Sequence, residues 1–232
     1  MLALEDVTYS RSACIDAIRG CYRFLATLDL DDALVSEPPD SGWPSITPSV
    51  LKDLDKTNEV VALLRHLPYL DNQAEPKCAP KCKFANWESN CTAIERGHTS
   101  AEGLEITTED PEIRDYVPSH VIGLTQGGRG TPTFLLDTTH GSISWYECPL
   151  EISAPAFHNT IDDDPYEYAS TEAEAEWLME SSTWAIEDFF DVLKDQFRSL
   201  NFVPLSKTGV VDVWTTFGPG SEGMVERVRG VL

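Results

Sequence analysis

The fold is decided by the stretch VPSHVIGLTQGGRGTPTFLLDTTHGSISWYEC, residues 117–148. It contains three short apolar runs, at 120–125, 134–137 and 142–147, and glycine-containing turns at 127–130 and 138–141 separate them. Short strands joined by tight glycine turns pair with one another as antiparallel hairpins. The stretch therefore predicts an antiparallel sheet.

The third predicted strand alternates in character. Ile143 and Trp145 alternate with Ser142 and Ser144. Because successive side chains of a strand point to opposite faces of the sheet, this pattern predicts one buried face and one face closer to solvent.

Helical patterns flank the predicted strands. The strongest lies at 184–200, where apolar residues recur at helical spacing: Ile186, Phe189, Phe190, Leu193, Phe197 and Leu200. Two N-terminal helices are expected, one at 12–28 and one that starts at Thr47–Pro48 and ends before Pro68. A further strand is expected at 210–217 and a short helix at 224–232.

These elements predict the α+β class. We expect an antiparallel sheet of about four to six strands, packed by the N-terminal helices and by the long C-terminal helix. We expect residues 1–232 to form a single domain. Residues 71–115 contain scattered proline and glycine and are expected to form an irregular insertion that carries cysteines. Residues 149–180 are expected to form an acidic loop, with a short helix at 171–179.

The charge of the chain excludes some partners. The sequence has 39 acidic and 17 basic residues, a net charge of -22, and no Lys or Arg lies between Gly130 and Leu193. Such a chain repels phosphate backbones and anionic membrane surfaces, so neither nucleic acid nor membrane is an expected partner.

No apolar run reaches the length of a membrane-spanning helix, which is about 18 residues. The N-terminus MLALEDVTYS lacks the basic and apolar regions of a secretory signal, so we expect a cytoplasmic protein with reduced thiols.

The acidic segment is the predicted binding site, with another protein, basic in character, as its partner. Its candidate residues are Asp162, Asp163, Asp164, Glu167, Glu172, Glu174 and Glu176. Two other interpretations stay open. The run could be a solvated surface that only keeps the protein soluble, or the three aspartates with Glu167 could form a weak calcium site, although the glycine and distal glutamate of an EF-hand loop are missing.

A second candidate site contains cysteines. Cys78, Cys82 and Cys91, followed by His98, could close a tetrahedral shell around zinc. The spacing lacks the two close pairs of the common zinc motifs, so unliganded thiols in a surface loop and a redox pair remain alternatives. A zinc-binding protein or a metal-dependent hydrolase that uses this loop is the alternative function.

Catalytic motifs do not emerge from the sequence. No HExxH or GxSxG pattern occurs. Gly123-x4-Gly128-Arg129-Gly130 is similar to a phosphate-binding loop, but it lacks the lysine, the serine or threonine and the following helix. We therefore predict no catalytic residue, and the sequence favours a binding module over an enzyme.

The order of these elements resembles the SUKH superfamily, which includes a yeast cell-wall regulator and many bacterial toxin-immunity proteins. The resemblance covers the second half of the chain, which also looks like uncharacterised fungal proteins with this core. The matching positions are Pro118, Ile122, Gly123, Gly128, Gly130, Leu136, Asp137, Gly141, Ile143, Trp145, Phe189 and Phe190. The resemblance implies a non-enzymatic protein-binding module of an adaptor, regulatory or immunity type.

Overall fold

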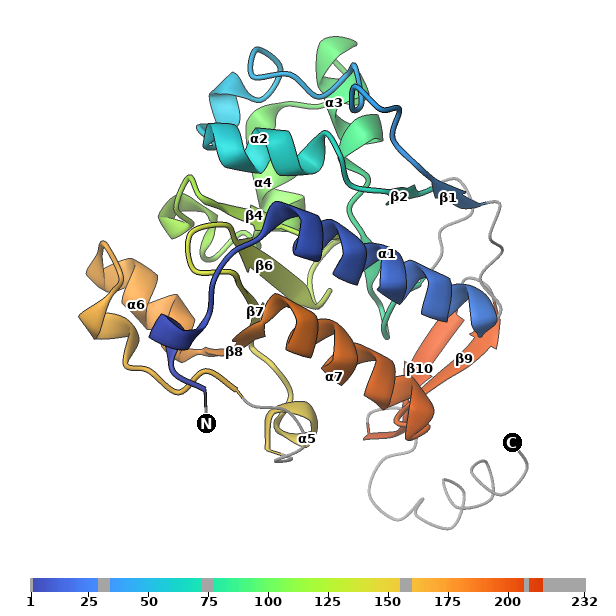
Figure 1. Ribbon diagram of the computed structural model, residues 1–232, viewed down its shortest axis with the longest axis vertical. Coiled ribbons are helices and arrows are strands. Elements are labelled where there is room, and N and C mark those ends of the chain that lie inside the picture. Colours follow the sequence, from blue (N-terminus) through green and yellow to red (C-terminus); the bar gives the residue numbers. More distant parts are fainter. Residues whose placement is uncertain (1, 29–33, 72–76, 155–159, 207–208, 215–232) are drawn as a thin grey trace.

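An antiparallel sheet of four strands lies at the centre of the computed structural model (Figure 1), which describes residues 2–28, 34–71, 77–154, 160–206 and 209–214. Its strand order is β4-β6-β7-β8. The strands are β4 Val121–Gly123, β6 Thr133–Asp137, β7 Ser142–Tyr146 and β8 Ser181–Ala185. Every neighbouring pair is antiparallel. The predicted α+β class and the three predicted strands are confirmed.

The glycine turn between β6 and β7 fits closely against the N-terminal segment. Gly141 has a φ of +77°, a conformation that residues with a side chain rarely adopt. A Cβ atom there would lie 2.7 Å from the backbone nitrogen of Tyr9. Glycine is therefore needed both for the turn and for this contact.

The strand β8 was not predicted. The expected helix at 184–200 begins two residues later, as α7 Ile186–Arg198, and Trp184 belongs to the sheet opposite Ile143. Trp184 is almost completely buried. The first three residues of β8 are serine or threonine, so the strand lacks the alternation of apolar and polar residues that predicts a strand from sequence. Its pairing with β7 identifies it.

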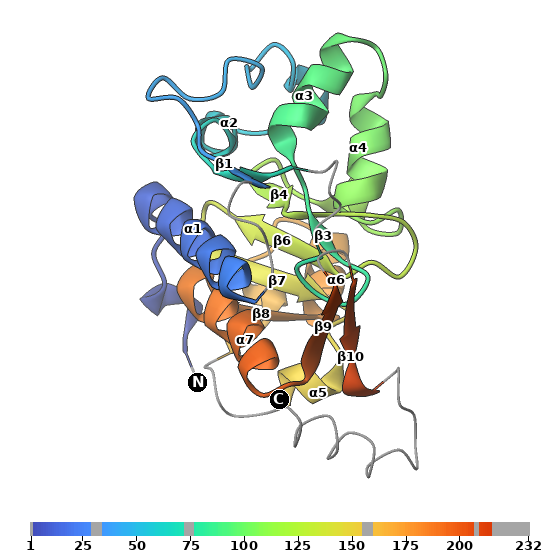
Figure 2. The same ribbon diagram turned by 90° about the vertical axis from the view of Figure 1, so that its right-hand side faces the viewer.

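Helices cover both faces of the sheet (Figure 2). On one face α7 packs against β7 and β8, and α1 Arg11–Thr27 packs against α7. The rings of Phe134 in β6 and Phe189 in α7 lie 4.9 Å apart, edge to face. The predicted packing of the sheet by an N-terminal helix and the late aromatic helix is thus observed.

The prediction that the serine face of β7 lies closer to solvent is wrong. Ser142 and Ser144 are each 4% exposed. The helix α6 Glu172–Met179 covers this face, where Trp177 joins Leu135 and Tyr146 in a second apolar cluster. The reason is that the acidic segment itself supplies a covering helix, which strand alternation does not reveal.

The second N-terminal helix is shorter than predicted. Residues Lys52–Leu54 form a 3-10 turn, and Asp55 follows in the left-handed conformation, with a φ of 48°. The helix α2 spans Asn58–Leu64. Thr57 caps α2 by accepting a hydrogen bond from the backbone N–H of Val60 (3.3 Å). The left-handed residue and this cap explain why the helix begins later than Thr47.

Residues 71–115 are not irregular, as far as the structure describes them. They include α3 Trp87–Glu95 and α4 Ala101–Thr108, capped by Asn86 and Ser100. The strand β3 Lys83–Phe84 pairs with β5 Thr125–Gln126. These caps and strand pairings join the segment to the rest of the fold. The glycines that suggested irregularity lie at or near helix ends: Gly97 follows α3 and Gly103 lies in the first turn of α4.

Short elements complete the fold. They are β1 Val35–Ser36 paired with β2 Tyr69–Leu70, β9 Phe202–Ser206 paired with β10 Gly209–Asp212, α5 Leu150–Ser153, and the 3-10 helices η1 Leu4–Asp6, η5 Arg114–Tyr116 and η6 Pro165–Glu167. The predicted strand at 210–217 is found over Gly209–Asp212, and the predicted helix at 224–232 lies outside the described residues. No helix in the described part of the chain has the length and apolar character to cross a membrane.

Candidate functional site

Where the structure describes it, at 149–154 and 160–180, the acidic segment has more regular structure than the predicted loop. It contains α5, η6 and α6, so the predicted short helix at 171–179 is confirmed. Thr171 accepts the N–H of Glu174 (3.1 Å), and the Glu174 carboxylate accepts the N–H of Ser170 (2.8 Å). The pair resembles a capping box at the start of α6, except that Glu174 reaches the residue before the N-cap and not the N-cap itself.

The structure divides the seven predicted binding carboxylates into two groups. Six of the seven are exposed, all except Glu174, and we call Asp162, Glu167, Glu172 and Glu176, which do not take part in the local contacts described next, the acidic face. The other three serve the local fold: Asp163 accepts a hydrogen bond from the N–H of Leu4, Asp164 accepts one from Tyr166, and Glu174 is 6% exposed. The prediction of Glu174 as a binding residue is therefore wrong, because its carboxylate accepts the N–H of Ser170 at the start of α6.

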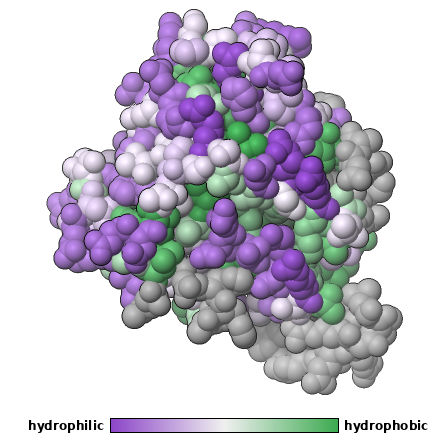
Figure 3. All heavy atoms as spheres, viewed as in Figure 1, coloured by the Kyte–Doolittle hydropathy of each residue, from purple (hydrophilic) through white to green (hydrophobic). Residues whose placement is uncertain are grey.

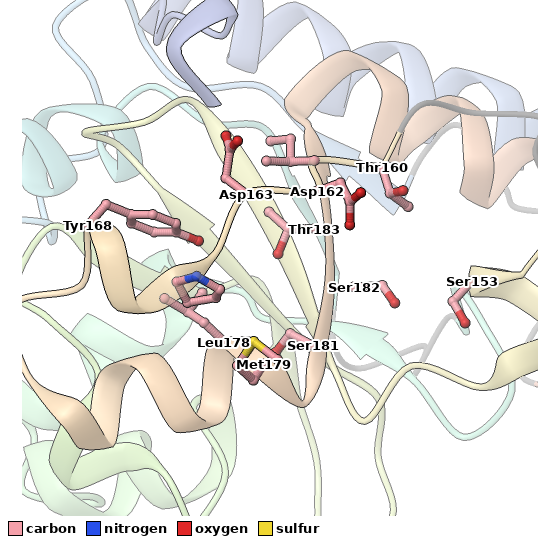
Figure 4. Close-up of a pocket in the computed structure, with 12 residues that line it drawn as sticks. Ser153, Thr160, Asp162, Asp163, Tyr168, Leu178, Met179, Ser181, Ser182 and Thr183 are labelled. Atoms are coloured by element: carbon pink, nitrogen blue, oxygen red, sulfur yellow. The ribbon is translucent and has the colours of Figure 1, made fainter. Parts of the chain in front are cut away.

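A cavity of about 260 Å³ lies beside the acidic face (Figure 4). Ser181, Ser182 and Thr183 of β8 form one side, and Asp162, Tyr168 and Met179 lie around it. Part of this sheet edge is covered, because the N–H of Ile161 donates to the carbonyl oxygen of Thr183 (2.8 Å). The cavity therefore follows the outer edge of β8.

Three large apolar side chains are exposed within the acidic segment, and one of them is Leu150, at its start, which is 77% exposed. Tyr166 is 56% exposed and Met179 is 60% exposed. In Figure 3, drawn in the same view as Figure 1, hydrophilic side chains cover most of the region around α6 and small hydrophobic patches lie between them. Exposed aromatic and methionine side chains surrounded by charge are typical of the centre and rim of a protein interface.

The electrostatic environment of the cavity is negative. Burial, together with the nearby carboxylates of Asp137, Asp163 and Glu174, raises the pKa of the Tyr168 hydroxyl to about 12. The sequence has no Lys or Arg between Gly130 and Leu193 to offset these charges. A cation or a basic side chain is thus the chemistry that this region favours.

The structure brings together His120, Asp137 and His140, a cluster that the sequence did not predict. His120 precedes β4, Asp137 ends β6, and His140 lies in the turn before β7. His140 Nδ1 lies 2.7 Å from Asp137 Oδ2, and His120 Nε2 lies 3.6 Å from the same oxygen. The only signal that could have found this cluster is strand pairing, because Val121 lies opposite Asp137.

The carboxylate of Asp137 is the centre of this cluster. Burial alone would raise its pKa, but the neighbouring His120 and His140 imidazoles outweigh burial and hold the pKa well below the ordinary range. In turn, the hydrogen bond to Asp137 raises the pKa of His140 above its ordinary value. Asp137 therefore remains an anion that attracts positive charge.

The predicted cysteine site does not assemble. Cys78, Cys82 and Cys91 are buried, so the interpretation as a surface loop is wrong, while His98 is exposed. Cys78 Sγ and Cys82 Sγ lie 3.6 Å apart, as free thiols. Within the described part of the chain, the three thiols and His98 do not gather as a set of metal ligands. The turn at 78–82 buries Cys78 and Cys82, and Cys91 lies on the buried side of α3, whereas His98 follows the exposed end of that helix.

The calcium interpretation of the three aspartates finds no support in their geometry. Asp163 and Asp164 accept backbone hydrogen bonds, and Figure 4 shows the side chains of Asp162 and Asp163 pointing in different directions. Among described residues, Asp162, Asp163, Asp164 and Glu167 do not form a ligand group.

Comparison of the chain with protein-family models, with curated proteins and with solved structures found no match.

Proposed function

We propose that this protein is a non-enzymatic, SUKH-like binding module that captures a basic protein on its acidic face. The observation that carries the proposal is the exposure of Tyr166 and Met179 among the carboxylates of the acidic face. Interfaces commonly place aromatic and methionine side chains at the centre and charged groups at the rim. The same region thus offers both parts of an interface.

The charge distribution supports a basic partner. Long-range attraction between a surface of net negative charge and a basic protein accelerates their encounter, and salt screens it. The exposed tyrosine and methionine would then contribute the short-range contacts. We expect the association rate to depend on the carboxylates and the dissociation rate to depend on Tyr166 and Met179.

The order of elements supports the SUKH-like assignment. Three hairpin strands are followed by an acidic segment, a fourth strand and the helix α7 with Phe189 and Phe190. Likeness of fold alone does not establish function, so the proposal depends on the chemistry of the acidic face.

The proposal places the interaction in the cytoplasm. Cys14 and Cys21 are buried on the inner side of α1 as free thiols. Buried free cysteine behaves as a small apolar residue and persists where thiols stay reduced.

Affinity capture from the native lysate tests the proposal. The tagged full chain is compared with a variant of the acidic face that carries Asp162→Asn, Glu167→Gln, Glu172→Gln and Glu176→Gln. Quantitative mass spectrometry at low and high salt measures the captured proteins. We expect a basic partner in stoichiometric amount that is lost at high salt and reduced about tenfold or more by the variant, since several charge pairs are removed together.

A matched control separates a local site from general charge. The control variant neutralises four exposed acids near α2 and α3, with the same change in net charge: Asp40→Asn, Asp53→Asn, Asp55→Asn and Glu95→Gln. Capture by this control should equal capture by the unchanged chain. If both variants lose the partner equally, or if capture is unchanged between low and high salt, the acidic face is not the binding site.

A further inference from the structure

We propose that His120, Asp137 and His140 bind a divalent transition-metal ion, with zinc as the ion that fits best. These three residues form the one group of potential ligands that the described part of the chain brings together. The site lies where β4 begins and β6 ends. It shares no residue with the acidic face or with the cysteine site, although the ring of His140 contacts that of Tyr168, which lines the cavity beside the acidic face.

The ligand atoms converge closely enough for one ion. One nitrogen of each histidine and a carboxylate oxygen of Asp137 lie within 4.8 Å of one another. Zinc binds nitrogen and carboxylate oxygen at about 2.0–2.2 Å in a tetrahedral shell, so two neighbouring ligands lie about 3.3–3.6 Å apart. The 3.6 Å between His120 Nε2 and Asp137 Oδ2 already fits this spacing, whereas the 2.7 Å contact between His140 Nδ1 and Oδ2 would have to widen on binding.

The local structure holds the carboxylate in the orientation of a ligand. Asp137 Oδ1 accepts the backbone N–H groups of Thr139 (2.6 Å) and His140 (2.9 Å) in the turn. Oδ2 therefore faces the two imidazoles. The backbone of His120 is held as well, because its carbonyl oxygen accepts hydrogen bonds from the N–H (3.0 Å) and the hydroxyl (2.8 Å) of Thr138.

An unsatisfied ring nitrogen points to a missing ligand. His120 Nε2 is buried, and it makes no hydrogen bond within the described residues. It lies 3.6 Å from Asp137 Oδ2, which is too far for a hydrogen bond. Buried polar atoms without a partner are rare, and coordination of a metal ion would satisfy this one.

The chemistry of the donor set favours zinc. Two imidazoles and one carboxylate suit zinc and other late first-row ions better than magnesium or calcium, which prefer oxygen alone. Three protein ligands leave a fourth position for water or for a group of a partner. The negative surroundings, which include Glu174 near His140, also favour a cation.

The competing explanation needs no metal. The hydrogen bond between His140 Nδ1 and Asp137 Oδ2 would by itself stabilise the carboxylate. The two explanations predict different metal uptake, so metal titration distinguishes them.

The test uses the purified full chain after treatment with a chelator. Calorimetric titration with zinc ions measures binding, and the visible spectrum of bound cobalt reports the ligand types. We expect one equivalent of zinc, binding weakened about tenfold or more by His120→Ala, and a cobalt spectrum of nitrogen and oxygen ligands without a thiolate band.

Two further variants keep the result interpretable. Asp137→Asn retains the oxygen that the turn amides need but removes the charge, and it should also weaken binding. His98→Ala removes an exposed histidine outside the site and should leave binding unchanged. Melting followed by circular dichroism shows whether each variant folds. The proposal is overturned if the chain takes up no zinc, if folded His120→Ala binds it equally, or if the cobalt spectrum shows thiolate ligands.

Discussion

Lys56 and Glu109 form an ion pair that is almost completely buried. Their side chains are 2% and 1% exposed, and Lys56 Nζ lies 2.9 Å from Glu109 Oε1. Neither carboxylate oxygen makes a hydrogen bond of good geometry in the described structure, so charge attraction is what holds the pair. Burial raises the pKa of Glu109, and Lys56 counteracts that effect. Each charge therefore depends on the other.

We predict that Glu109→Gln lowers the free energy of unfolding by about 3–5 kcal/mol, because it leaves the buried charge of Lys56 unpaired. The double variant Lys56→Met, Glu109→Leu should lose less than the single variant, since it removes both charges. Urea denaturation at pH 7 measures both. Asp53→Asn serves as the control: its pair with Lys52 is exposed, and the expected change is under about 0.5 kcal/mol. Equal losses in Glu109→Gln and Asp53→Asn would contradict the prediction.

Individual side chains were the least predictable part of this protein. The sequence identified Glu174 only as one carboxylate among several, whereas its capping role depends on where α6 begins. It did not identify His120 and His140 as neighbours, because the register of β4 against β6 decides that they meet. Local composition contains neither kind of information.

At the scale of elements, β4 and α4 approach each other very closely at Gly123. A Cβ atom on Gly123 would overlap the carbonyl group of Thr108 at the end of α4. The indole N–H of Trp87 in α3 donates to the carbonyl oxygen of Gly123 (3.1 Å). Glycine at this position therefore lets two helices of the 71–115 segment pack against the edge of the sheet.

We predict that Gly123→Ala lowers the free energy of unfolding by about 1–3 kcal/mol, because the backbone of Thr108 must move. Gly128→Ala is the matched control, since a Cβ atom there would meet no heavy atom within 4 Å. The control should be as stable as the unchanged chain or more stable by up to about 1 kcal/mol. Chemical denaturation of both variants measures the difference. Comparable stability of the two variants would show that Gly123 is not needed for the packing of α4.

Elements with a strong periodic pattern were predicted well. The helix α7 has a continuous apolar side, and it begins within two residues of the predicted start. The strand β8 was missed because three of its five residues are serine or threonine, and its place in the sheet comes from pairing with β7. The helices α3 and α4 were missed because Gly103 and the prolines and glycine around the two helices were taken as breaks in structure.

At the scale of the whole molecule, the net charge of -22 acts on the folded state itself. Like charges repel one another in the compact state more than in the extended chain, so an excess of one sign destabilises the fold. Salt screens this repulsion: the Debye length falls from about 30 Å at 10 mM to about 10 Å at 100 mM.

We predict that the melting temperature rises by about 2–4 °C when sodium chloride increases from about 10 mM to about 100 mM, equivalent to about 1 kcal/mol for a chain of this size. Differential scanning calorimetry measures the change. The variant of the acidic face with four neutral residues should show a smaller rise, because less repulsion remains to be screened. A melting temperature that falls or stays constant would mean that repulsion among these carboxylates does not limit stability.

The sequence by itself determined the class of the fold, three strands of the central sheet, the helices α1 and α7, and the excess of negative charge. These features follow from local periodicity, turn residues and composition, all of which act over a few neighbouring residues. Only the tertiary structure decided that α6 covers the second face of the sheet, that the cysteines are buried away from His98, and that His120, Asp137 and His140 meet. Those outcomes depend on strand register and on the packing of distant segments, and neither property is determined by a short stretch of sequence.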